Sequence, residues 1–142
     1  MSDFSKGLAD ALANHIFRNT QHTSPSAVFV ALHDAGGGVA ADPSDIQATA
    51  DDSELTYTSY VRQEATFGAP TGTDDAVVAN TGVLVFPAVD TGEGPVEVTG
   101  ISLWDAETSG NMLCQFAVDA VKEFADGDAP TIRVGELEFT ID

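Results

Sequence analysis

Hydrophobic residues near the start of the chain recur at every fourth position. The stripe consists of Phe4, Leu8, Leu12 and Ile16. This spacing places the four side chains on one face of an α-helix. Ser2 or Asp3 can cap the start of the helix, because a side-chain oxygen there accepts a hydrogen bond from a free N–H of the first turn. The polar run 19–25 ends the pattern, so the sequence predicts an amphipathic helix over residues 1–20.

From residue 26 onward the pattern has the period of β-strands. Residues 27–32 form a continuous apolar run with the length of a buried strand. Later segments are short or alternating, and turn signals such as 91–95 and 107–111 separate them. The expected strands cover 57–67, 76–78, 82–86, 96–104, 112–118, 131–134 and 137–141. The spacing predicts a mainly β fold, an antiparallel β-sandwich of about seven or eight strands over residues 26–142.

A long polar stretch interrupts the strands at residues 36–54. It opens with Gly36, Gly37 and Gly38 and continues with acidic residues that include Asp42 and Asp45. An irregular connection of this length is uncommon inside a compact domain and usually serves binding or is mobile. We therefore expect an exposed acidic loop that contacts a partner.

Length and charge narrow the class of protein. A chain of 142 residues predicts a single domain over 1–142. The 23 acidic residues outnumber the five basic ones, which gives a formal charge of −18. This charge disfavours binding to nucleic acid and to anionic membranes, and no apolar run has the length of a membrane span. The acidic residues are dispersed along the chain, which favours adaptation to high salt over an acidic tail. A merely acidic domain from an ordinary habitat is the alternative.

The residues that could carry chemistry do not form a recognisable site. The single cysteine, Cys114, lies in an apolar strand segment without a basic neighbour, so we expect it in the core. The three histidines, His15, His22 and His33, lack the spacing of a zinc site. Acid pairs such as 51–52 and 126–128 could bind calcium, but solvated turn carboxylates are the favoured interpretation. We predict no catalytic residues, no metal and no cofactor.

Short motifs follow one another along nearly the whole chain. They are Val28–His33, Tyr60–Gln63 leading to Phe67, 80–87, 98–106, 110–113, and 127–128 before a terminal strand pair. In this order they resemble a group of small virion proteins from tailed viruses, described as tail-fibre-like or capsid-decorating. The sequence departs from the group at Gly100, where a histidine or similar residue commonly stands nearby, and in its longer acidic loop. With the charge, the resemblance implies a virus of a halophilic archaeon.

The motif residues also have structural interpretations. Arg62 can pair with a neighbouring carboxylate, Trp104 can fill the sandwich core, and Asp105 can cap the turn that ends at Gly110. These interpretations are favoured over direct ligand binding, so the motifs are expected to determine the fold.

The resemblance implies a non-enzymatic structural protein of the virion. The first hypothesis is a decoration or turret component on the outer capsid lattice. Its partners would be the major capsid protein and other virion proteins, and it would form a homo-oligomer, with a trimer favoured. The predicted contact elements are the helix, with Phe17 as an additional residue, and the 36–54 loop. Alternatively, the helix covers an open end of its own sandwich.

The second hypothesis is a tail, fibre or baseplate-associated module that attaches to the host surface. A third, an acidic hydrolase, would require a pocket with a coupled pair of carboxylates.

Overall fold

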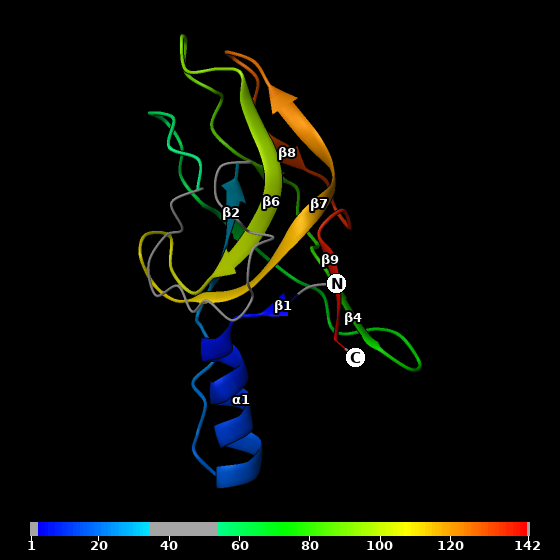
Figure 1. The fold of residues 1–142 in the computed structure, drawn as a ribbon. Coiled ribbons are helices and arrows are strands. Elements are labelled where there is room, and N and C mark those ends of the chain that lie inside the picture. Colours follow the sequence, from blue (N-terminus) through cyan, green and yellow to red (C-terminus); the bar gives the residue numbers. More distant parts are fainter. Residues whose placement is uncertain (1–2, 35–53, 142) are drawn as a thin grey trace.

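The computed structural model describes residues 3–34 and 54–141, and these residues form a mainly β fold with one helix (Figure 1). This confirms the fold class predicted from the sequence. The elements are β1 (Asp3–Phe4), α1 (Lys6–Arg18), β2 (Val28–His33), β3 (Gln63–Ala65), β4 (Ala76–Ala79), β5 (Leu84–Val85), β6 (Val96–Trp104), β7 (Met112–Phe124), β8 (Thr131–Ile132) and β9 (Glu138–Ile141).

All strand pairs among the described residues are antiparallel. The largest sheet has five strands in the order β1-β7-β6-β2-β3. Two ribbons, β4–β9 and β5–β8, accompany it. The long strands β6 and β7 run beside each other through the centre of the sheet (Figure 1). They form the hairpin that the alternation and the 107–111 turn predict.

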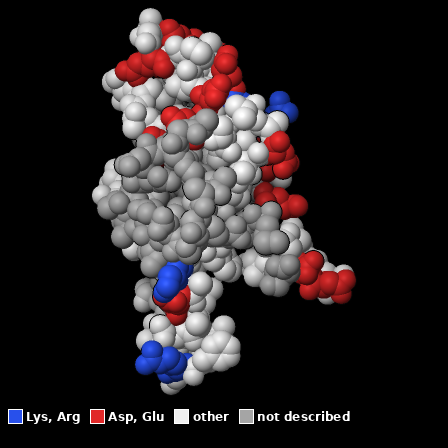
Figure 2. All heavy atoms as spheres, viewed as in Figure 1, with Lys and Arg blue, Asp and Glu red and all other residues white. Residues whose placement is uncertain are grey.

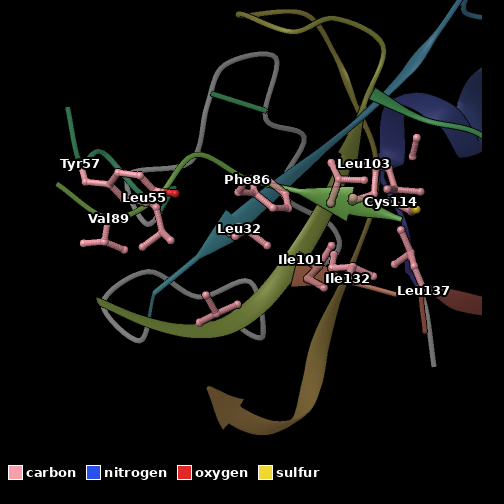
Figure 3. Packing of buried hydrophobic residues seen from close by; sticks show 14 residues of the cluster. Leu32, Leu55, Tyr57, Phe86, Val89, Ile101, Leu103, Cys114, Ile132 and Leu137 are labelled. Atoms are coloured by element: carbon pink, nitrogen blue, oxygen red, sulfur yellow. The ribbon is translucent and has the colours of Figure 1, made fainter. Parts of the chain in front are cut away.

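The main hydrophobic core joins the five-stranded sheet to the β5–β8 ribbon and to buried residues of the connecting segments (Figure 3), and Phe139 of β9 packs against it. Alternate residues of β2 point to opposite faces of the sheet, as the pleat requires. Val30 and Leu32 enter the main core, whereas Ala31 belongs to a second, smaller cluster. The main core contains Leu55, Leu84, Phe86, Val89, Ile101, Leu103, Cys114, Ile132 and Leu137, among others.

The helix begins later than the sequence pattern suggests. Phe4 is part of β1 and pairs with Cys114 of β7, so its inclusion in the helical stripe is wrong. Ser5 is the N-cap, in place of Ser2 or Asp3, and its Oγ accepts a hydrogen bond from the Leu8 N–H at 3.1 Å. The Ser5 N–H donates to the Leu113 carbonyl at 2.8 Å. The chain is therefore held to β7 up to the residue that starts the helix.

α1 ends at Asn19, whose left-handed backbone (φ 54°) forms the C-cap. The helix projects from one end of the β layers (Figure 1), and none of its residues is buried. It therefore does not close an end of the sandwich along its length. In the described ranges, no helix is both long enough and apolar enough to cross a membrane.

Most strands differ somewhat in length from the prediction: β5 and β8, for example, are shorter than the expected 82–86 and 131–134, and two strands differ most. Only Gln63–Ala65 of the expected strand 57–67 is a strand. The Tyr57 hydroxyl instead donates to the Pro87 carbonyl at 2.8 Å, outside any ladder. β7 continues to Phe124 rather than ending at residue 118, because the first residues of β6 pair with 122–124 across a bulge.

Candidate functional site

Arg62 is the centre of a buried polar network. Its guanidinium makes a two-pronged ion pair with Glu54, with Nε and Nη2 at 2.8 and 2.7 Å from the two carboxylate oxygens. Nη1 donates to the carbonyls of Ala106 and Ser109 at 3.1 and 2.8 Å. The guanidinium carbon lies 3.9 Å from the centre of the Trp104 ring. Arg62 thus ties Glu54 to the β6–β7 turn, which is more than 40 positions away in the sequence, and its predicted pairing with a carboxylate is confirmed.

Tyr60 connects the same carboxylate to the sheet. Its hydroxyl donates to Glu54 at 3.2 Å and accepts a hydrogen bond from the Leu32 N–H at 2.9 Å. Burial, together with the nearby Glu54 charge, raises the pKa of the Tyr60 hydroxyl well above its usual value. The Tyr60 ring stacks on Phe86 in the main core, with the ring centres 6.2 Å apart. The hydroxyl is therefore a fixed structural donor in its neutral form.

A second group of polar side chains lies on the same face of the sheet as Trp104. The Trp104 Nε1–H donates to Ser102 Oγ at 2.6 Å, and the same oxygen lies 2.6 Å from His33 Nε2. All three side chains are completely buried. Trp104 is buried as predicted, but it belongs to the second cluster with Ala31 and not to the main core. The strand registers that pair β2 with β6 bring these side chains together.

His33 stands opposite Gly100 in the β2–β6 ladder. Gly100 is the position at which the sequence departs from the motif it resembles. His33 also forms an isolated bridge with Glu54, which continues the sheet edge beyond β3. The motif segments around residues 33, 62 and 104 therefore meet through backbone pairing and side-chain contacts.

Asp105 closes the turn between β6 and β7, as predicted. Its carboxylate accepts hydrogen bonds from the Asn111 backbone N–H at 2.6 Å and from the Asn111 side-chain amide at 2.8 Å. Ser109 and Gly110 both have positive φ, 55° and 80°. A Cβ atom at Gly110 would lie 2.4 Å from the Asp105 carboxylate, so only glycine fits there.

An open depression of about 390 Å³ lies beside this turn. Its lining combines a carboxylate, hydroxyl groups and one exposed valine over the buried Arg62 pair. The lining residues are Glu54, Tyr60, Val61, Arg62, Glu107, Thr108 and Ser109. Glu54 is paired with Arg62, whereas Glu107 is exposed at the rim. Such a surface can bind a polar, uncharged ligand through hydroxyl and carbonyl groups.

The turn carboxylates at 126–128 bind the protein's own backbone. Asp126 accepts hydrogen bonds from the N–H groups of Gly92 and Gly94, both at 2.8 Å. These two bonds lower the pKa of the Asp126 carboxyl. Asp128 accepts from the Ala125 N–H at 3.0 Å. The favoured interpretation of this pair as turn carboxylates is therefore consistent with their contacts.

The other residues singled out for chemistry have structural contacts. Cys114 is 2% exposed, and burial raises the pKa of its thiol to about 12. His15 Nδ1 accepts a hydrogen bond from the His22 backbone N–H at 3.3 Å. Among the described residues, no group of three or more metal-ligating side chains comes together.

The predicted contact residues that lie in the described ranges do not form one site. Leu8 and Leu12 are partly buried, while Ile16 and Phe17 are exposed at the far end of the helix. Phe4 packs against the main core from β1. The loop candidates Gly36, Gly37, Gly38, Asp42 and Asp45 lie outside the described residues.

Two residues of the buried polar groups around Arg62 and Trp104 were not identified from the sequence. Glu54 falls at the end of the expected acidic loop 36–54, and the sequence pattern predicts no role for Ser102. The available signal was the position of Ser102, two residues before Trp104 and so on the same face of its strand. No comparable pattern marks Glu54, because its partner depends on how residues 55–62 fold.

These features define a small antiparallel β protein with a projecting helix and a buried polar network that joins its sequence motifs. The model of the family described as Podophage GP4 fiber I protein gp80 matches residues 3–140, and the chain belongs to this family. No curated protein matches the sequence. As a member of a fibre-protein family, the chain is a structural component of the virion, which confirms the predicted location and the resemblance to tail-fibre-like proteins.

Proposed function

We propose that this protein is a tail-associated fibre component that helps the virus attach to the host surface. The observation that carries the proposal is the match to a fibre-protein family over residues 3–140. This match favours the tail hypothesis over decoration of the capsid lattice, which was the first hypothesis from the sequence. The partners of such a component are other virion proteins at the tail and a molecule on the host cell.

A binding role without catalysis is part of the proposal. Glu54 is engaged by Arg62, and Cys114 is buried with a raised thiol pKa. Catalysis by acids or by a thiol needs an ionisable group that is accessible and near its reacting partner. The contacts of the Glu54 carboxylate and the burial of the Cys114 thiol favour a structural role for both residues.

The open depression beside the β6–β7 turn is the surface we assign to host contact. Its rim residues Glu107 and Thr108 are exposed. Its floor is fixed from below by Arg62, which holds two carbonyls of the turn. A rigid, polar and open surface suits the hydroxyl groups of a cell-surface glycan, because the surface loses little conformational entropy on binding.

The location is tested on purified virus particles. Gold-labelled antibodies against this chain should mark the tail, and quantitative mass spectrometry should give far fewer copies than the major shell protein. Label spread evenly over the capsid, with a copy number that approaches that of the shell protein, would support the decoration hypothesis instead.

The contact surface is tested by filling the depression. The variant Thr108→Trp should slow adsorption of particles to host cells, because the indole occupies the space between the rim and Val61. The matched control is Thr73→Trp, at an exposed position in the loop before β4. Equal adsorption by both variants would exclude the depression as the contact surface, whereas the location on the tail would stand.

The origin from a halophilic archaeal virus also remains part of the proposal. It is supported by the 23 acidic residues against five basic ones. Many acidic groups remain on the described surface (Figure 2), where high salt screens their repulsion.

A further inference from the structure

The helical arm, residues 5–27, consists of α1 and the segment that leads back from it to β2 (Figure 1). It carries two large apolar side chains at its far end. Ile16 is 67% exposed and Phe17 is 82% exposed. No residue of α1 is buried, although the helix is amphipathic. The arm therefore presents apolar surface that its own fold leaves open to solvent.

The arm has little intrinsic stability. α1 has 13 residues, and helices shorter than about 12–15 residues are marginal in water without packing. Gly7 lowers the helix propensity further relative to alanine. The Ser5 cap and the ion pair between Lys6 and Asp10 support the first turns. The exposed far end would be stabilised by a surface that covers Phe17.

The arm also differs in charge from the rest of the chain. It holds Lys6 and Arg18, two of the five basic residues, and only one of the 23 acidic residues, Asp10. In Figure 2 the basic side chains of the arm lie at one end of the molecule, whereas acidic side chains gather on the β layers. A slightly basic arm is therefore attached to a strongly acidic body.

We propose that the arm docks on the acidic body of a second copy of this chain. The positive Arg18 and the apolar Phe17 would contact a surface of the opposite charge. Contact between two bodies would instead bring like charges together. Because arm and body are different surfaces, the contact is head-to-tail and generates a ring or a row of copies. The trimer favoured from the sequence is one such ring. This inference does not depend on where in the virion the protein lies.

The test measures self-association of the full-length protein by sedimentation velocity over a concentration series, at one fixed moderate salt concentration. Arg18→Glu and Phe17→Ala should each weaken self-association by at least about tenfold, because the first reverses the charge that faces the acidic body and the second removes a buried aromatic side chain. Phe17→Leu should retain most of the association. The control Arg133→Glu reverses a basic residue on the body and should not weaken association. Circular dichroism checks that each variant keeps the wild-type fold.

Three results would overturn the proposal. The first is a wild-type protein that stays monomeric at every concentration. The second is association that survives Arg18→Glu but not Phe17→Ala, which would indicate contact between two arms. The third is a chain that stays monomeric and binds isolated tails only when Phe17 is present. This result would mean that the arm docks on another virion protein and not on a second copy.

Discussion

Replacing Arg62 with methionine tests whether the buried network holds the fold. Arg62 is 4% exposed, and its replacement leaves the Glu54 carboxylate without its two charged donors. Breaking a buried ion pair on one side costs about 3–5 kcal/mol, because the remaining charge is left without its counter-charge; here the Glu54 carboxylate would keep the Tyr60 hydroxyl as a donor but would lose the guanidinium. The carbonyls of Ala106 and Ser109 also lose a donor. This loss is a large part of the roughly 5–15 kcal/mol that stabilises a typical domain.

The single tryptophan makes the assay direct. Trp104 is fully buried against Arg62, so its fluorescence should change when the protein unfolds in urea. The free energy of unfolding of Arg62→Met should fall by about 3–5 kcal/mol relative to wild type. The free energy of unfolding of Arg62→Lys should fall by less, because the lysine ammonium keeps the positive charge but cannot make the two-pronged ion pair. Arg133→Met, at an exposed arginine, serves as the matched control.

The double variant Glu54→Leu/Arg62→Met distinguishes the ion pair from simple loss of volume. Removing both charges leaves no isolated buried carboxylate, so this variant should be more stable than Arg62→Met alone. If Arg62→Met were no less stable than the Arg133→Met control, the network would not contribute to stability, and the reasoning would be refuted.

Salt, pH and thiol reactivity test other parts of the structure. Raising NaCl from about 0.05 to 1 M should increase the free energy of unfolding in urea titrations, because salt screens repulsion among acidic groups; equal stability would contradict salt adaptation. The lowered pKa of Asp126 means that its contribution is present above the ordinary value of 3.8 and is lost as pH falls through the lower folded-state value. Between about pH 7 and pH 3, Asp126→Asn should therefore lose less stability than wild type, and an identical loss would refute this contribution. The buried Cys114, with a thiol pKa of about 12, should react with a thiol reagent only as fast as the protein unfolds; rapid labelling of the folded protein would show that the core is open.

Local patterns predicted the elements whose partners are close in the sequence. β6 and β7 form a hairpin whose turn can be predicted from the sequence. Asp105 and Gly110 stabilise this turn through contacts within a stretch of seven positions. The helix was predicted from its stripe, but its start was misplaced by the apolar residue Phe4. An isolated phenylalanine at the right spacing fits either a helix or a strand, and the pairing with Cys114 decides between them.

Long-range contacts account for what the sequence did not predict. Residues 57–62 of the expected strand 57–67 are irregular, because Tyr57, Tyr60 and Arg62 satisfy their polar groups outside a ladder. Which carboxylate pairs with Arg62 depends on the placement of Glu54 beside His33, a bridge that spans 21 positions. Periodicity carries no information on such pairings, since it reports only which face of an element is apolar.

The buried network explains why the motifs of this chain lie where they do. Its members come from β2, from the segment before β3, from β6 and from the β6–β7 turn. A buried ion pair is poor evidence for stability by itself, because desolvation offsets much of its attraction. Its clearest consequence here is geometric: Arg62 can reach Glu54 and both turn carbonyls only when the three segments share one arrangement. The network therefore fixes the turn beside the open depression, and a fixed turn is what a binding surface at that position requires.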